Sequence, residues 1–81
     1  MGSIRLIEMD DEGQPEWITV RLSNEEAAFI AKFTGKQSED SANEVMKGGA
    51  VANRMLFETF TGEVFNRYCD GGVDEWIRDN L

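Results

Sequence analysis

Histidine is absent from these 81 residues, and cysteine occurs once, at Cys69. A single cysteine cannot form an intramolecular disulfide, and a closed zinc site built from His and Cys ligands is excluded. Cys69 also lacks an imidazole base to generate the thiolate that nucleophilic catalysis requires, so it is expected to be a buried structural residue. The chain is therefore expected to be no enzyme and to bind no metal and no cofactor.

Basic residues are half as numerous as acidic residues, eight against sixteen, which gives a formal net charge of −8. Such a surface repels phosphates, so direct binding to nucleic acid or to an anionic membrane is not expected. The sequence has no long apolar run and no charged-then-apolar leader, which, with the missing disulfides, predicts a cytoplasmic location. The expected partner is a protein with a basic surface.

The length allows one hydrophobic core, so a single domain over residues 1–81 is expected. The opening Met1-Gly2-Ser3 is native or a cloning remnant and has no part in this prediction. A domain of this size buries only about 60% of its unfolded surface, which leaves it marginally stable. Self-association is a common source of further buried area, so a homodimer is expected.

Two segments near the start, residues 4–9 and 17–22, are rich in β-branched and large apolar residues, with polar residues 10–16 between them. This pattern predicts a β-hairpin, with Gly13 supplying the positive φ of the turn and Pro15 at an edge position. The second segment has a clear period of two, with one set formed by Ile18, Val20 and Leu22 and the other by Trp17, Thr19 and Arg21. One face of the hairpin is therefore expected to be buried.

A helix is expected to begin at Ser23, because Ser23 and Glu26 have the spacing of a capping box. It is expected to end at Gly35 as a C-terminal cap. A second capping box, Ser41 with Glu44, predicts a short helix that stops at Gly48-Gly49, and residues 36–40 between the two helices are expected to be polar and mobile.

From Ala50 to about Tyr68 the apolar residues have a helical period, which predicts a long central helix. The expected core row of this helix consists of Ala52, Leu56, Phe60, Val64 and Tyr68. A last short helix is expected after Gly71-Gly72, with Trp76 closing the core.

The predicted fold class is α+β, with the element order ββα(α)αα. An isolated hairpin is not stable in water, so the N-terminal hairpin is expected to pack on a small helical subdomain. In particular, Phe60 and Val64 of the central helix are expected to contact Ile18 and Val20.

The hairpin has most of the candidate binding residues. Five carboxylates fall within nine residues, and they are Glu8, Asp10, Asp11, Glu12 and Glu16. The spacing is not that of an EF-hand calcium loop, since a loop starting at Glu8 would require Glu where Thr19 stands. The loop is expected to be either a solvated turn or an acidic protein-binding loop.

Trp17 lies on the strand face opposite Ile18, together with Thr19 and Arg21. A two-stranded sheet has one covered face, so an indole on the other face is expected to meet a partner or a second subunit. Candidate partner-binding residues are thus Trp17, Thr19 and Arg21 together with the five carboxylates. Should this surface be unused, the Gly48-Gly49 region with Met46, or the Trp76 helix, is the next candidate.

Parts of the chain resemble uncharacterised small acidic proteins of bacteriophages, such as those of actinobacterial phages. The resemblance covers residues 25–32, 42–46 and 57–79 and includes no diagnostic motif. It implies a role in the host cytoplasm during infection, such as occupying a host protein or blocking a defence system. No activity and no site residue follow from it.

These observations favour a non-enzymatic protein-binding module, a phage-type modulator or inhibitor of a basic host protein. The alternatives are a DNA mimic that occupies a nucleic-acid groove, and a homo-oligomeric structural protein or enzyme subunit. The charge density is modest for a mimic, because duplex DNA has one charge per ~1.7 Å of axis.

Overall fold

The computed structural model describes residues 3–81 of the chain, and their side chains from residue 6 onward. The fold is α+β, a two-stranded antiparallel hairpin followed by helices, and both the class and the order of elements agree with the prediction. Met1 and Gly2 lie outside the described residues. The elements are β1 (Ser3–Met9), β2 (Pro15–Arg21), α1 (Asn24–Gly35), α2 (Glu39–Val45), α3 (Gly49–Glu58), η1 (Thr59–Phe65), α4 (Asn66–Tyr68) and α5 (Gly72–Asn80).

The register of the hairpin explains why only β2 has a clean alternation in sequence. Ile4 pairs with Val20 but Leu6 pairs with Thr19, so Arg5 has no residue opposite it. This extra residue moves the rest of β1 to the other face relative to β2, as a β-bulge does. A second irregularity leaves Glu16 unpaired, between the pairs Glu8 with Trp17 and Met9 with Pro15.

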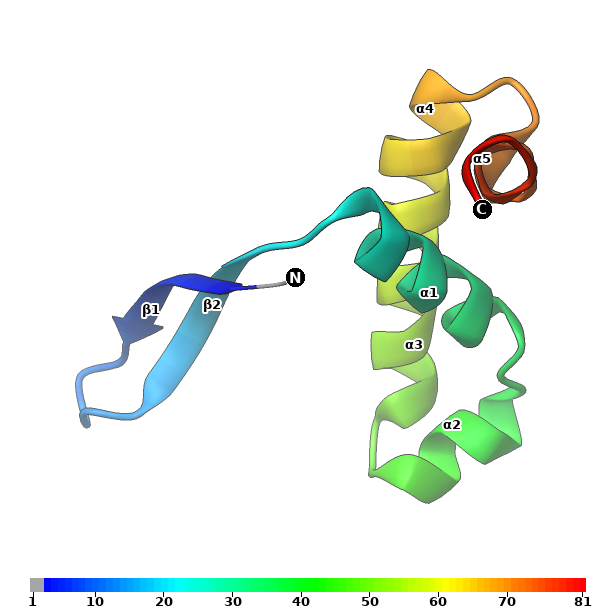
Figure 1. The fold of residues 1–81 in the computed structure, drawn as a ribbon. Helices are drawn as coiled ribbons and strands as arrows, with labels where there is room; N and C mark the ends of the chain where they lie inside the picture. The colour runs from blue at the N-terminus through cyan, green and yellow to red at the C-terminus, as the bar shows by residue number, and fades with distance from the viewer. Residues whose placement is uncertain (1–2) are drawn as a thin grey trace.

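The hairpin does not pack on the helices, which corrects one part of the prediction. It projects from the helical part of the molecule as an arm, joined to α1 through residues 22 and 23 (Figure 1). In the part of the chain that the structure describes, the backbone of each strand comes close only to the other strand. The expected contacts of Phe60 and Val64 with Ile18 and Val20 are therefore wrong.

Helix α1 begins as its sequence predicts. Ser23 is the N-cap, and its hydroxyl accepts a hydrogen bond from the Glu26 amide at 3.1 Å while Glu26 accepts one from the Ser23 amide at 3.1 Å. The helix ends at Gly35, but the capping residue is Lys36 in a right-handed conformation, not a left-handed glycine. Gly35 instead lies against the ring of Phe57, because a Cβ on Gly35 would stand 3.0 Å from that ring.

Helix α2 begins three residues earlier than predicted, so residues 39 and 40 are helical and not part of a mobile loop. The capping box is formed by Ser38 and Ser41, whose hydroxyls accept hydrogen bonds from each other's amides at 3.0 and 2.9 Å. Ser41 thus takes the role that Glu or Gln has at the third position of the usual capping box. The expected box of Ser41 and Glu44 was therefore wrong.

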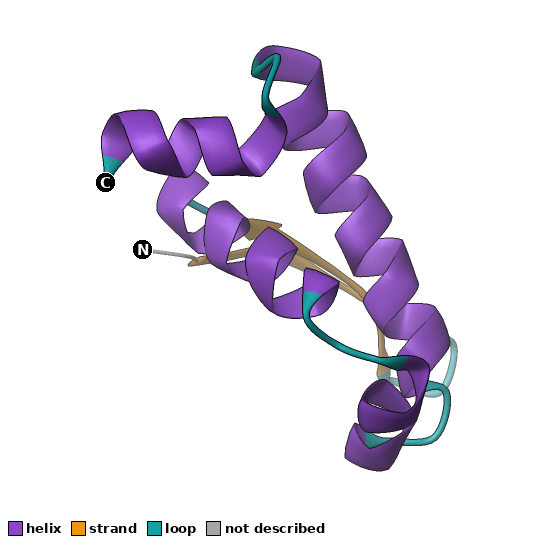
Figure 2. Cartoon of the chain, turned by 90° about the vertical axis from the view of Figure 1, so that its right-hand side faces the viewer, coloured by secondary structure: helices purple, strands orange, loops and turns teal. Residues whose placement is uncertain are grey.

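The long central helix is confirmed as α3, η1 and α4 in succession, seen in Figure 2 as one continuous rod. Its middle section η1 is a π-helix, in which hydrogen bonds join residues five apart; the Asn66 amide, for example, donates to the Thr61 carbonyl oxygen. The wider π turn changes which side chains face α1. Phe65 becomes buried, while Ala52, Leu56 and Tyr68 of the predicted core row are exposed and Phe60 and Val64 are half-buried.

The core lies where α1, the second half of the central helix and α5 meet. Three alanines of α1 pack around Phe65, and they are Ala27, Ala28 and Ala31. Trp76 of α5 packs on the same cluster, with its ring centroid 5.8 Å from that of Phe65, as the sequence predicted for this tryptophan. An ion pair between Lys32 and Asp74, 2.8 Å long, also joins α1 to α5.

Cys69 follows α4 and is half-buried, whereas the sequence analysis expected a buried residue. Its amide donates to the Phe65 carbonyl oxygen at 2.8 Å. Cys69 therefore lies at the end of the central helix. The π turn before it rotates the residues that follow about the helix axis. None of the helices in residues 3–81 combines the length and the apolar content that a membrane crossing requires.

Candidate protein-interaction surface

All eight candidate binding residues lie on the arm, and the structure brings them into one surface. The pair of Leu6 with Thr19 and the pair of Glu8 with Trp17 are two positions apart in the register, with the pair of Ile7 and Ile18 between them, so these four side chains share one side of the hairpin. We call it the tryptophan face and include Arg21, which follows Thr19 by two residues. Asp10, Asp11 and Glu12 lie in the turn beyond this face, and Glu16 lies at the irregularity next to it.

Trp17 is 65% exposed. Its place away from the core agrees with the sequence prediction. A tryptophan buries a large apolar area when it binds, which makes an exposed one on a projecting arm a candidate anchor. Glu8 lies directly across the strands from it and is also exposed.

The turn owes its shape to Asp10. Its carboxylate oxygen Oδ1 accepts hydrogen bonds from the amides of Glu12 and Gln14, both at 2.9 Å, and its own amide donates to the Gln14 carbonyl oxygen at 2.8 Å. Gly13 has φ of 79°, as the turn requires. Asp10 is therefore a structural residue of the loop, whereas these hydrogen bonds use no side-chain atom of Asp11 or Glu12.

The opposite side of the arm is apolar. Ile7 pairs with Ile18, and Met9 and Val20 follow at two-residue spacing on the same side. We call these four residues the apolar face; they are between 43% and 59% exposed. Sequence reasoning found Ile18 and Val20 by their period of two, but it placed them in the core, because it had no signal for where the arm points.

A second apolar surface lies on the helical part, and sequence reasoning named only its Met46 and Gly49, as the next candidate after the arm. It is a groove of about 200 Å³ between α1, α2 and α3. Four large apolar side chains in its lining are exposed, and they are Phe33, Val45, Met46 and Leu56. Phe29 stacks on Phe33 with ring centroids 5.8 Å apart and extends the apolar surface along α1. The helical period of Leu56 was visible in the sequence, but it was taken as evidence of burial.

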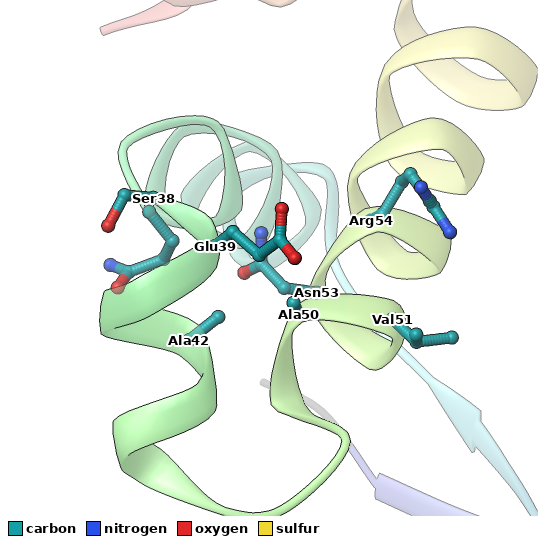
Figure 3. Close-up of a pocket in the computed structure, with 8 residues that line it drawn as sticks. Ser38, Glu39, Ala42, Ala50, Val51, Asn53 and Arg54 are labelled. Atoms are coloured by element: carbon teal, nitrogen blue, oxygen red, sulfur yellow. The ribbon is translucent and has the colours of Figure 1, made fainter.

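A more polar hollow of about 250 Å³ opens on another side of the α2–α3 junction (Figure 3). Its charged lining residues are one carboxylate, Glu39, and one guanidinium, Arg54. The amide of Asn53 in its wall donates to the Thr34 carbonyl oxygen at 2.9 Å and so helps to hold α3 against α1.

Across residues 3–81, no three His, Cys, Asp or Glu side chains come together in a way that would hold a metal ion. No protein-family model matches the chain, and neither a curated protein nor a solved structure matches it. Function therefore has to be inferred from the arm and the groove themselves.

Proposed function

We propose that this chain is a non-catalytic protein-binding module that uses the tryptophan face of its arm and the acidic turn beyond it. The observation that supports this proposal is the exposed Trp17, which stands opposite Glu8 on a hairpin that projects away from the core. Interfaces take most of their affinity from a few buried aromatic or Arg anchors, while charges at the rim guide the encounter. The partner is a protein with a basic surface around an apolar pocket.

The resemblance to small phage proteins gives this proposal its setting: a modulator or inhibitor of a host protein or defence system, acting in the cytoplasm. The charge of the arm supports a basic partner, because residues 3–21 contain five carboxylates and two basic residues, Arg5 and Arg21. Edge strands of a hairpin also offer unpaired backbone groups, which a partner strand can extend.

Trp17→Ala is expected to weaken partner capture by about 30-fold, which corresponds to the ~2 kcal/mol of an anchoring aromatic residue. The fold is expected to remain intact, because Trp17 makes no core contact. The immobilised protein would capture partners from lysate of the host cell, and mass spectrometry would identify them. Tyr68→Ala is the matched control, since Tyr68 is also exposed but lies on the helical part; equal capture by the Trp17 and Tyr68 variants would refute the role of the tryptophan face.

The double reversal Asp11→Lys with Glu12→Lys is expected to slow association with a basic partner about tenfold at low salt and to matter little at high salt. Rim charges act mainly on the association rate, and salt screens them over about 10 Å at 0.1 M. Asp10 is left unchanged because its carboxylate holds the turn. The measurement is the association rate by surface plasmon resonance at two salt concentrations, and an unchanged rate at low salt would mean that the turn is not near the partner.

DNA mimicry is less well supported by the arrangement of charges. A mimic needs carboxylates in extended rows that follow the two phosphate backbones. Those of the arm gather around one turn, from Glu8 to Glu16. The capture experiment separates the two functions, because capture by a mimic would collapse at high salt, while an interface anchored by Trp17 would persist.

A further inference from the structure

The molecule exposes more surface than a compact monomer of its size. Its accessible surface is 6501 Å², whereas a monomeric protein of 9.1 kDa exposes about 4,900 Å². The radius of gyration is 14.5 Å, against roughly 11.7 Å for a compact chain of this length. The excess of roughly 1,600 Å² is of the size that one subunit buries in an obligate homodimer, about 1,000–2,500 Å².

Two apolar surfaces account for much of what is left open, and they lie on different parts of the chain. One is the apolar face of the arm, with Ile7, Met9, Ile18 and Val20. The other is the groove between α1, α2 and α3. A two-stranded hairpin is marginally stable in water unless its apolar side is covered, so the arm needs a cover as much as the groove does.

We propose that the two surfaces cover each other between two copies of this chain. The arm of one copy lays its apolar face in the groove of the second, and the arm of the second does the same in return. Such a reciprocal contact closes around a twofold axis, as most homodimers do. One type of contact then covers all four open surfaces of the pair, and the tryptophan faces of both arms stay outside.

Charge favours the groove over a second arm as the binding site of the apolar face. Two arms side by side would bring together two sets of five carboxylates, and like charges oppose association. None of the ten residues that line the groove is charged. The charged residues next to them in the sequence are four basic ones, Lys32, Lys36, Lys47 and Arg54, with Glu44 as the single acidic one.

The oligomeric state tests this arrangement. Light scattering after size exclusion, at up to about 100 μM protein, is expected to give twice 9.1 kDa, because this concentration is a hundredfold above a micromolar Kd. Ile18→Glu, on the apolar face, is expected to give a monomer. Thr19→Glu, one residue further on the tryptophan face, is the matched control and is expected to remain a dimer. A monomeric parent protein, or a dimeric Ile18 variant, would overturn the proposal.

Mixing two variants distinguishes arm-in-groove exchange from pairing of two arms. Leu56→Glu damages the groove and leaves the arm intact, and it is also expected to be monomeric. A mixture of the Ile18 and Leu56 variants has one intact arm and one intact groove, so it is expected to form a heterodimer detectable by native mass spectrometry. A dimeric Leu56 variant, or a mixture that stays monomeric while each variant alone is monomeric, would overturn exchange.

Two further variants separate loss of the dimer from damage to the hairpin and from loss of partner capture. Ile18→Thr retains the strand preference of a β-branched residue and is expected to weaken the dimer at least tenfold, should Ile18→Glu disturb the hairpin itself. Trp17→Ala is expected to remain a dimer, since Trp17 lies on the other face. Loss of partner capture with the dimer intact thus concerns the proposed function, while loss of the dimer with Trp17 in place concerns this inference.

Discussion

Phe65→Ala is expected to remove a large share of the free energy of unfolding of this protein. Phe65 is 2% exposed, the central helix presents it to three alanines of α1, and its ring contacts that of Trp76. Truncating a buried phenylalanine costs about 3–5 kcal/mol, because the small alanines around it cannot close the cavity. A chain of this length has roughly 4–12 kcal/mol of total stability, so the loss is a large share of it. Thermal unfolding followed by circular dichroism measures the change.

Tyr68→Ala is the control on the same helix. Tyr68 is 76% exposed, and its ring lies 5.6 Å from the guanidinium carbon of Arg67 in a solvent-exposed cation–π contact. Such contacts contribute about 0.5–1 kcal/mol at exposed sites, so a shift of a few degrees at most is expected. If both variants unfolded at the same temperature, the π turn would not place Phe65 in the core.

Phe65 is buried and Tyr68 is exposed, and this difference within the central helix could not be predicted from the sequence. A period of 3.6 residues predicts that Leu56, Phe60, Val64 and Tyr68 share a face, and the helix itself was predicted correctly. The π turn over residues 59–65 shifts the later residues relative to the earlier ones, so no single period describes both ends. Nothing in the residue pattern predicts where such a turn occurs.

The arm shows a second limit. Its alternation predicted strands and turn correctly, because these depend on residues close in sequence. The bulge at Arg5 was not predicted, since it depends on which residues pair across the hairpin. The direction of the arm depends on the backbone at residues 22 and 23, where the sequence shows only the start of α1.

The candidate site was predicted in part for the same reason. Trp17 and the five carboxylates were found by residue type and by strand face, and the structure keeps them together on the arm. The structural role of Asp10 was missed. Its carboxylate accepts hydrogen bonds from the amides of residues 12 and 14, and an Asp that bonds the backbone a few residues further on is a usual turn signal. Of the groove, only Met46 and Gly49 were named from the sequence, because an exposed Leu56 looks the same as a core residue in sequence.

Gly49→Ala is expected to destabilise the protein by ~3 kcal/mol, at the upper end of what overpacking costs. Gly49 is buried at the start of α3, and a Cβ there would overlap the backbone carbonyl oxygen of Ala42 in α2. A flexible side chain could move aside, but this oxygen belongs to a helix, so α2 as a whole has to shift. Urea unfolding of the variant and the parent, followed by circular dichroism, gives the difference.

Gly62→Ala is the matched control and is expected to change stability in the opposite direction. A Cβ on Gly62 meets no atom within 4 Å, and the residue is exposed within the central helix. Alanine is therefore expected to stabilise the folded chain by about 0.5–1 kcal/mol, as it does in helix interiors. Stabilisation by both substitutions would mean that helix preference decides at position 49 as well, and that α2 and α3 do not approach as closely as the structure indicates.

The same two variants also test whether the groove takes part in the proposed dimer. The groove is lined by Gly49 and by three residues of the α2 segment, Ala42, Val45 and Met46, so a displaced α2 changes the shape of the groove. Gly62 lies outside the groove. The Gly49 variant is thus expected to weaken the dimer at protein concentrations where it is still folded, and the Gly62 variant is expected to leave the dimer unchanged. A folded Gly49 variant that dimerises as well as the parent would show that the second copy does not depend on this groove.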